Sequence, residues 1–366
     1  VADVGTLRDI PWEPTVAAGL GDFRQQDGGE HPACPRSLLK RVRQRCRDMG
    51  YEAYFGCEYE FFLFQETPDS LHEKGFSNLR SLTPGMCGYS WLRSGQNHAL
   101  VVDVLDNMAA FGIDIEGFHT ETGPGVYEAA LHYDEVLAAA DQAALFKVAM
   151  KEVAHHHGLS VTFMAKWNAA LPGCSGHLHQ SLRRRDGDNA FYAAEGLSRT
   201  LRHYLGGLCS LMGEVTAMVS PTINAYKRYV PGVWAPLTAS WGVDNRTAAA
   251  RVIGIDSQSA CRIEYRQPAA DINPYLAMAA CLGAGLYGIE HALEPPQPIS
   301  GDASTRGEPL PATLNDACER FSGSARCRQV FGDAFVDHYA HTRRHEVAEY
   351  RRAVSDWELK RYFEAI

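Results

Sequence analysis

Residues 54–64 have the sequence YFGCEYEFFLF, which sets two carboxylates within a run of aromatic side chains. Aromatic residues favour strands, so we predict a β-strand over these residues. Successive side chains of a strand point to opposite faces, which puts Glu58 and Glu60 on one face together with Phe62. Like charges on one face of a buried strand are costly unless a cation lies between them. Either this face binds a metal ion, or it is exposed and both carboxylates point into water.

The rest of the chain alternates helices and strands around this segment. Periodicity and turn signals predict helices over about 36–49, 98–111, 134–157, 196–214 and 273–291, and a helical tail from 311. They predict further strands near 113–119, 126–132, 160–166, 175–182, 235–242, 247–253 and 261–267, and a long loop over 66–96. Strand pairs joined by tight turns and interrupted by helices indicate an α+β fold, with a mostly antiparallel sheet and helices on one side. We expect residues 1–35 to be an irregular lead-in segment and residues 36–366 to form one domain.

The composition excludes several classes of protein. The net charge is −9, which has the wrong sign for broad attraction to nucleic acid or to an anionic membrane surface. Ten cysteines include no C-x-x-C pair, a pattern typical of reduced, buried thiols in a cytoplasmic protein. The longest uncharged apolar stretch, residues 275–289, is shorter than the ~20 residues of a membrane span and predicts a buried helix.

A second pair of carboxylates brackets a tight turn. Glu121 and Glu128 lie on either side of the turn sequence TGPG, residues 122–125, so the turn can bring them together. Glu116 and His119 precede this turn, and His119 shares a strand face with Glu121. The alternative interpretation is a polar hairpin on the surface of the protein.

Two histidines form a third polar stripe. In the stretch GHLHQSL, the side chains of His177, His179 and Ser181 share one strand face. The loop before them, residues 173–176, contains glycines that allow the backbone to approach a ligand closely. Two structural histidines are the alternative, and the three arginines at 183–185 are interpreted as the solvated end of a hairpin.

Arginines complete the pattern. Arg262, Glu264 and Arg266 occupy one face of a predicted strand, and Arg246 and Arg251 lie just upstream. Carboxylates with histidine suit Mg²⁺ or Mn²⁺, and guanidinium groups would balance a polyphosphate, so the combination indicates phosphoryl transfer. Taken alone, the arginines are equally compatible with a ladder of cross-strand ion pairs. The sequence contains no Walker A or Rossmann glycine pattern.

The order of these motifs resembles the catalytic domain of the glutamine synthetase superfamily, from about Ile10 to the C-terminus. The motifs, in chain order, are Glu58-x-Glu60, His119-x-Glu121 with Gly-Pro-Gly and Glu128, His177-x-His179-x-Ser181, YKRYVPG (226–232), NRT (245–247), Arg262-x-Glu264-x-Arg266 and NPYL (273–276). The resemblance implies a curved, mostly antiparallel sheet backed by helices. It also implies ATP as co-substrate, two ions of Mg²⁺ or Mn²⁺ per site, and a γ-glutamyl phosphate that an amine then attacks.

The resemblance further implies a role for each motif residue. One metal ion would be held by Glu60, Glu121 and Glu128, and the second by Glu58, His177 and Glu264. ATP would be contacted by Glu116, His179, Ser181, Arg246 and Arg251, with Arg246 also steadying the transferred phosphoryl group. Glutamate would be bound by Arg228 and Arg266 through its carboxylates, and by Gly173 and His177.

The departures from the family pattern concern the amine. Glutamine synthetases carry a Glu in the flap after the K-R-x-V-P-G motif, where it helps to bind and deprotonate ammonium; the matching residue here is Trp234. An indole cannot act as a base, but it can form an apolar or cation–π wall for a larger amine. Residues 241–247 also resemble the γ-glutamyl-amine ligase branch, and Val126 replaces a usual Gln.

Three functions follow as hypotheses. The first is an ATP-dependent ligase that joins glutamate to an organic amine, the second is glutamine synthesis from ammonia, and the third is a non-catalytic scaffold of the same fold. We expect residues 1–35 not to form the β-grasp domain that precedes the catalytic domain in this family. The family forms stacked rings, so we expect a homo-oligomer.

Overall fold

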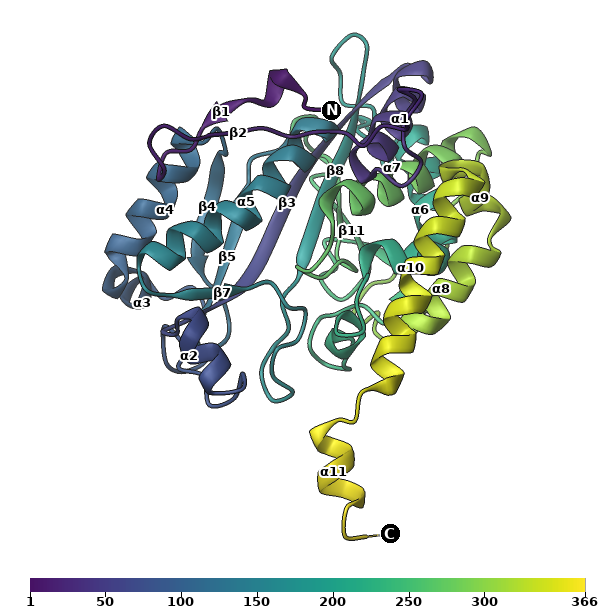
Figure 1. Ribbon diagram of the computed structural model, residues 1–366. Helices are drawn as coiled ribbons and strands as arrows, with labels where there is room; N and C mark the ends of the chain where they lie inside the picture. Colours follow the sequence, from purple (N-terminus) through teal and green to yellow (C-terminus); the bar gives the residue numbers. More distant parts are fainter. Residues whose placement is uncertain (366) are drawn as a thin grey trace.

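The fold is organised around one long strand, β3 (Tyr51–Phe64), in a computed structural model that describes residues 1–365 (Figure 1). The main sheet has nine strands, seven of them in the order β10-β11-β12-β8-β3-β5-β4, while β6 and β7 also pair with β3. The bounds of the other strands are β4 (Ile115–Thr120), β5 (Val126–Leu131), β6 (Asp134–Glu135), β7 (Ser160–Thr162), β8 (Gly176–Arg184), β10 (Trp241–Val243), β11 (Ala250–Ile253) and β12 (Arg262–Tyr265). Every strand pair in this sheet is antiparallel except β10 with β11, which confirms the predicted fold class.

Helices cover one side of this sheet (Figure 1). Their bounds are α1 (Pro35–Asp48), α2 (Pro68–Glu73), α3 (Trp91–Gln96), α4 (His98–Ala110), α5 (Val136–His156), α6 (Arg199–Val219), α7 (Pro274–Glu290), α8 (Leu314–Gly323), α9 (Ala325–Phe331), α10 (Asp333–Arg352) and α11 (Asp356–Tyr362), with 3₁₀ turns η1 (Val4–Thr6) and η2 (Ala225–Arg228). The apolar stretch at 275–289 lies in the buried helix α7, as predicted. Within the described residues, no helix has the length and apolar character needed to span a membrane.

The aromatic side of β3 forms part of the core. Tyr59 and Phe61 are fully buried, and each ring lies 6.1 Å from the ring of Phe146 in α5. Burying such rings is worth several kcal/mol in total, which holds α5 against the sheet. Because strand side chains alternate, the two carboxylates of β3 point to the opposite face, away from these helices.

A glycine contact sets the close packing of α6 against α7. A Cβ atom on Gly207 would overlap the carbonyl oxygen of Ala284 and lie 2.6 Å from Cα of Gly288. A Cβ atom on Gly288 would overlap the carbonyl oxygen of His203. The two helix backbones therefore touch at a point where no side chain fits.

Replacing Gly207 with Ala should destabilise the protein by about 1–3 kcal/mol or more, because the helices must separate to admit the methyl group. Thermal unfolding should show a transition several degrees lower. Gly95→Ala is the matched control, since its Cβ would have no atom within 4 Å in α3. That control should leave stability unchanged or slightly raised. A Gly207→Ala protein that melts with the wild type would contradict the close-contact argument.

The lead-in segment is attached to the core by one buried arginine. Arg36 in α1 donates two hydrogen bonds of 2.8 Å to the carboxylate of Asp141 in α5, and a third of 2.8 Å to Asp3. Besides η1, the segment contains the paired strands β1 (Arg8–Asp9) and β2 (Ala17–Ala18). The division of the chain at residues 35 and 36 stays a prediction.

Three predicted elements differ from the structure. The predicted strand at 235–242 is two strands, since β9 (Thr238–Ala239) pairs with β13 (Glu308–Pro309) in a separate sheet and only β10 joins the main one. The strand predicted at 160–166 ends at Thr162, because the side chain of Asn224 bonds both the N–H and the carbonyl of Lys166 in place of a neighbouring strand. The loop at 66–96 contains α2 and α3, each started by a hydroxyl cap, Thr67 and Ser90.

Candidate active site

Strand register brings the acidic and histidine side chains into one row across the sheet. The directly opposed pairs are Glu60 with Glu128 (β3 and β5), Glu58 with His177 (β3 and β8), and Glu264 with His179 (β12 and β8). Residues far apart in the sequence therefore meet on the face of β3 that points away from the helices. Strand alternation, predicted from the sequence, decides which face of the sheet these side chains share, and the pairing register decides which of them are neighbours across strands.

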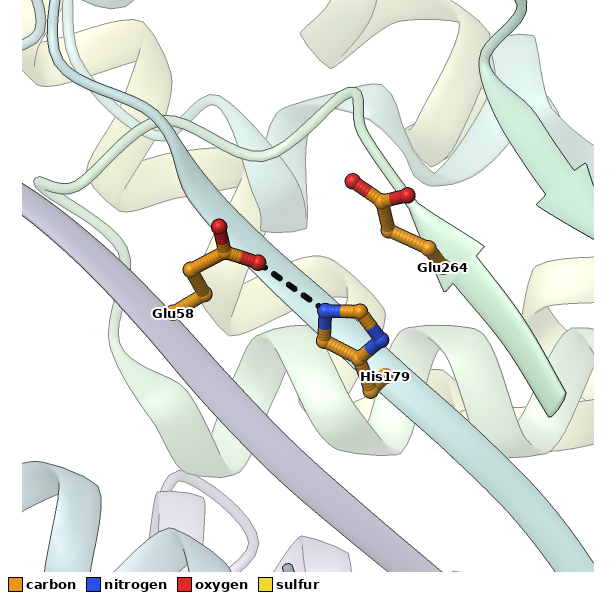
Figure 2. Close-up of side chains that lie close together, drawn as sticks. All are labelled: Glu58, His179 and Glu264. Atoms are coloured by element: carbon orange, nitrogen blue, oxygen red, sulfur yellow. Dashed lines mark hydrogen bonds and ion pairs between the residues drawn. The ribbon is translucent and has the colours of Figure 1, made fainter. Parts of the chain in front are cut away.

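The tightest group in this row is Glu58, His179 and Glu264, drawn in Figure 2. Each offers one ligand atom, and these atoms all lie within 4.8 Å of one another. Nε2 of His179 lies 2.9 Å from Oε2 of Glu58. Among residues 1–365 this is the one group of three His, Cys, Asp or Glu side chains that converges so closely. The structure thus brings His179, predicted to contact ATP, into the group where His177 was predicted.

His177 lies beside the same group, within reach of both carboxylates. Its Nδ1 is 3.4 Å from Oε1 of Glu264 and 3.8 Å from Oε2 of Glu58, and the residue is buried. Neither of its ring nitrogens makes a hydrogen bond with the described residues. Burial opposes ionisation of Glu58, but the two neighbouring imidazoles of His177 and His179 outweigh it and lower the pKa of that carboxyl. Buried imidazole nitrogens without partners beside ionised carboxylates suit Mg²⁺ or Mn²⁺ as ligand.

The second predicted ligand set, Glu60, Glu121 and Glu128, does not converge within 4.8 Å among the described residues. Oε2 of Glu60 accepts a hydrogen bond of 2.6 Å from the N–H of Ser175, and Oε1 of Glu121 accepts one of 2.7 Å from Thr122. Oε2 of Glu121 is buried and has no hydrogen-bond partner among residues 1–365. Burial, and the neighbouring carboxylates of β3, raise the pKa of Glu128 to about 8. A cation would relieve this crowding of like charges, so these oxygens also fit a divalent metal.

A cavity of about 1080 Å³ opens next to the Glu58 group. Its lining includes all five residues predicted to contact ATP, which are Glu116, His179, Ser181, Arg246 and Arg251. Glu116 lies at a β-bulge, where the register of β4 against β5 shifts between Ile115 and Gly117. Such bulges redirect a side chain, and here the redirected side chain of Glu116 lines the cavity. The volume is ample for a nucleotide.

Sequence reasoning missed one residue that lines this cavity, Arg183. Its guanidinium carbon lies 4.1 Å from the centre of the Tyr54 ring, and it donates a 3.3 Å hydrogen bond to the hydroxyl of Tyr133. Residues 184 and 185 are exposed at the hairpin end, as interpreted from the sequence, whereas Arg183 is half-buried and also lines the cavity. The signal was present, because Arg183 continues the period-2 face of β8 that carries His179 and Ser181.

The arginines predicted to bind glutamate lie deeper. Arg228 is 5% exposed and donates only to the backbone carbonyls of Gln267, at 3.1 Å, and Arg266, at 3.4 Å. Gly173 packs against it, since a Cβ atom there would lie 2.9 Å from Cγ of Arg228. Arg266 pairs with Glu264, while its Nε is buried without a partner among the described residues. Arg228 is thus a buried cation with no carboxylate within 4 Å in the described chain, an arrangement that suits an anionic ligand.

The comparison with protein families decides the identity. A family model described as "Glutamine synthetase, catalytic domain" matches residues 32–362. The chain belongs to the glutamine synthetase family. The solved structure "GmaS/ADP complex-Conformation 1" superposes on it with a TM-score of 0.89 at 32% identity, covering 99% of this chain and 84% of that one.

Relatives in the glutamine synthetase family include proteins named as glutamine synthetases and proteins named as synthetases or ligases of γ-glutamyl amines. The chain is 42% identical to "Type-1 glutamine synthetase 2" of Dictyostelium discoideum, over 100% of this chain and 71% of that protein. It is 41% identical to "Gamma-glutamylethanolamide synthetase GlnA4" of Streptomyces coelicolor, over 99% and 78%, and 38% identical to "Glutamate--isopropylamine ligase" of a Pseudomonas species, over 100% and 81%. The chain is therefore an ATP-dependent glutamate ligase, and its resemblance to the amine-ligase branch is confirmed. Homo-oligomeric assembly and a cytoplasmic location stay predictions.

The residue that departs from the glutamine synthetase pattern, Trp234, lies on the loop after η2. It is 64% exposed and has a φ of +56°, a left-handed conformation that is rare for a bulky side chain. It does not line the nucleotide cavity. Core packing therefore does not explain the strained backbone and the exposed ring of Trp234 in this loop.

Proposed function

We propose that this ligase joins glutamate to an organic amine, through γ-glutamyl phosphate, at a site with two divalent metal ions. The observation that carries the choice of amine is Trp234, which occupies the flap position where glutamine synthetases have a Glu. An exposed indole offers an apolar, cation–π surface to an alkylammonium group, and it cannot accept the proton of ammonium. The names of two relatives, an ethanolamide synthetase and an isopropylamine ligase, support the same choice.

The positions of the arginines support the first half of the reaction. Arg228, which packs beside Gly173, holds a carboxylate of glutamate, and this carboxylate supplies the interaction that the guanidinium lacks in the free protein. Arg246 and Arg251 line the cavity and neutralise the phosphates of ATP. Bound between the carboxylates and His177, Mg²⁺ or Mn²⁺ would supply Lewis-acid stabilisation of the phosphoryl group in transfer.

Phosphorylation of the γ-carboxylate prepares the second half. The carboxylate oxygen is a poor leaving group, whereas phosphate leaves readily when the amine nitrogen attacks the carbonyl carbon of the γ-carboxyl group. The amine nitrogen must be neutral to attack, so the alkylammonium group gives up one proton to water before the attack, and a second proton leaves the nitrogen as the amide forms and phosphate departs. An apolar wall beside the amine releases its water and favours the neutral form. Trp234 provides this wall in our proposal.

Phosphate release from ATP with glutamate tests the proposal directly. The full chain would be assayed with ethylamine, isopropylamine, ethanolamine, putrescine and ammonia under identical conditions, with Mg²⁺ and with Mn²⁺. We expect at least one organic amine to give a kcat/KM well above that of ammonia. Turnover with ammonia that exceeds every organic amine would overturn the choice and favour glutamine synthesis.

Exchanging Trp234 for Glu should move the preference toward ammonia. The carboxylate restores an anionic group at the flap position, while the apolar wall is lost. We expect the ratio of kcat/KM for the best organic amine to that for ammonia to fall about tenfold or more, about 1.4 kcal/mol. Val233→Glu is the matched control, because it places the same charge on the neighbouring exposed residue. An unchanged ratio in Trp234→Glu would count against the role of the indole.

A further inference from the structure

We propose that His119 is a positioning residue for the metal site, one that orients the Glu128 carboxylate and is itself held by the ring of Tyr89. This inference rests on the proposed metal ligands, of which Glu128 is one. Neither His119 nor Tyr89 has a role in the function proposed above. The inference is based on the contacts that these two side chains make in the structure.

The first observation is the contact between His119 and Glu128. The two residues are directly opposed across β4 and β5, and Nε2 of His119 lies 3.3 Å from Oε1 of Glu128. Nδ1 of the same ring lies 3.3 Å from the carbonyl oxygen of Thr120. Both nitrogens of the ring therefore face oxygen atoms, which fixes the plane of the imidazole. Among residues 1–365, His119 is the one basic side chain within 4 Å of the Glu128 carboxylate.

The second observation is the stack that holds the imidazole from one side. The ring of Tyr89 lies 4.7 Å from the ring of His119, with 29° between the two planes. Tyr89 is 68% exposed, so burial in the core does not keep it there. Its backbone does, because its N–H donates a 2.6 Å hydrogen bond to the carbonyl of Thr120, and the N–H of Ser90 donates one of 2.9 Å to the Thr120 hydroxyl.

The backbone of Tyr89 shows that this placement has a cost. Its φ is +50°, in the left-handed region that disfavours residues with a Cβ. A strained residue persists only where its surroundings hold it. Here the strain brings an aromatic ring onto His119 rather than into the core.

A held carboxylate is what a metal site at this position needs. Glu128 lies opposite Glu60, another proposed ligand, so the two like charges would turn away from each other when no cation is bound. A histidine contact on one oxygen keeps the other directed at the site. Such partners of metal ligands affect metal affinity by about 10- to 100-fold.

Mn²⁺ binding to the full chain, without ATP or glutamate, tests the inference through the electron paramagnetic resonance signal of free Mn²⁺. We expect His119→Phe, which keeps the stack and loses the nitrogen, to weaken one of two Mn²⁺ sites by about 10-fold or more and to leave the other unchanged. His119→Gln, whose amide can still donate, should recover most of that affinity. Tyr89→Ala should weaken the same site by about 3-fold or more, and Tyr89→Phe, which keeps the stacked ring, should retain more of the affinity than Tyr89→Ala.

The matched control is a second histidine that contacts a carboxylate outside the proposed metal site. His157→Phe removes another histidine–carboxylate contact, 2.8 Å from Asp103 at the end of α5, and should not alter Mn²⁺ binding. Equal affinities in wild type, His119→Phe and Tyr89→Ala would overturn the inference alone. A wild-type chain that binds no Mn²⁺ would overturn the metal site of the proposed function instead. If His119→Phe does not fold, Tyr89→Ala decides, because it must weaken one site and spare the other.

Discussion

Replacing Glu264 with Gln should lower the rate of the ligase on the order of 1000-fold. Glu264 is 2% exposed and is the carboxylate shared by the His179 group and by His177. Burial opposes its ionisation, yet His177 and Arg266 outweigh burial and lower the pKa of Glu264 to about 2. It is therefore anionic at neutral pH, as a metal ligand must be. Losing one charge at a site that stabilises phosphoryl transfer costs several kcal/mol, which is the expected factor.

The Glu264→Gln substitution should also lower the stability of the fold, because Glu264 pairs with two arginines. Glu264 lies 3.0 Å from Arg251 and also pairs with Arg266, which is itself buried. Removing the anion of a buried ion pair costs about 3–5 kcal/mol when the cation is left without a partner. Gln keeps the size of the side chain and an oxygen acceptor, so we expect a melting temperature that is lower by several degrees in a protein that still folds.

Two measurements separate these effects. Circular dichroism reports folding and the melting temperature, and phosphate release at a temperature well below melting reports the rate. Glu308→Gln is the control. Glu308 is exposed in β13, which belongs to a separate two-stranded sheet and not to the sheet that carries the proposed ligands. Its rate and melting temperature should match the wild type. Wild-type turnover in a folded Glu264→Gln protein would refute its assignment as a metal ligand.

Strand alternation made much of this site predictable from the sequence. A period of two residues placed Glu58 with Glu60, and His177 with His179, on common faces before any pairing was known. Helices α1, α4, α5 and α7 were predicted within a few residues, because their apolar periodicity and their Gly and Pro boundaries are local signals. The motif order, through its resemblance to a family, then supplied the roles.

Register and long-range contacts could not be predicted in the same way. Which histidine meets Glu264 depends on how β8 slides against β12, and nothing within either strand specifies that offset. The split of the predicted strand at 235–242 depends on β13, some 70 residues later in the chain. The hydrogen-bond partners of Arg228 are likewise distant in sequence, since they are backbone carbonyls of the segment that follows β12.

Replacing Arg228 with Met should raise the KM for glutamate by about 30- to 5000-fold. Truncating one partner of a buried, hydrogen-bonded charge pair costs about 2–5 kcal/mol of binding, and in our proposal the partner of Arg228 is a carboxylate of the substrate. The KM for ATP should change little, because Arg228 does not line the nucleotide cavity. Arg202→Met is the control, since Arg202 is an exposed arginine that pairs with Glu294 at 3.4 Å.

The stability of Arg228→Met should distinguish a ligand-binding role from a structural one. Burial lowers the pKa of Arg228, so the charged guanidinium is disfavoured in the free protein. The carbonyl of Gln267 keeps a second donor, the hydroxyl of Tyr229 at 3.1 Å, when the guanidinium is removed. Replacing an uncompensated buried cation with an apolar side chain should therefore leave the melting temperature unchanged or raise it. A large fall in melting temperature with an unchanged KM for glutamate would show that Arg228 serves the fold instead of the substrate.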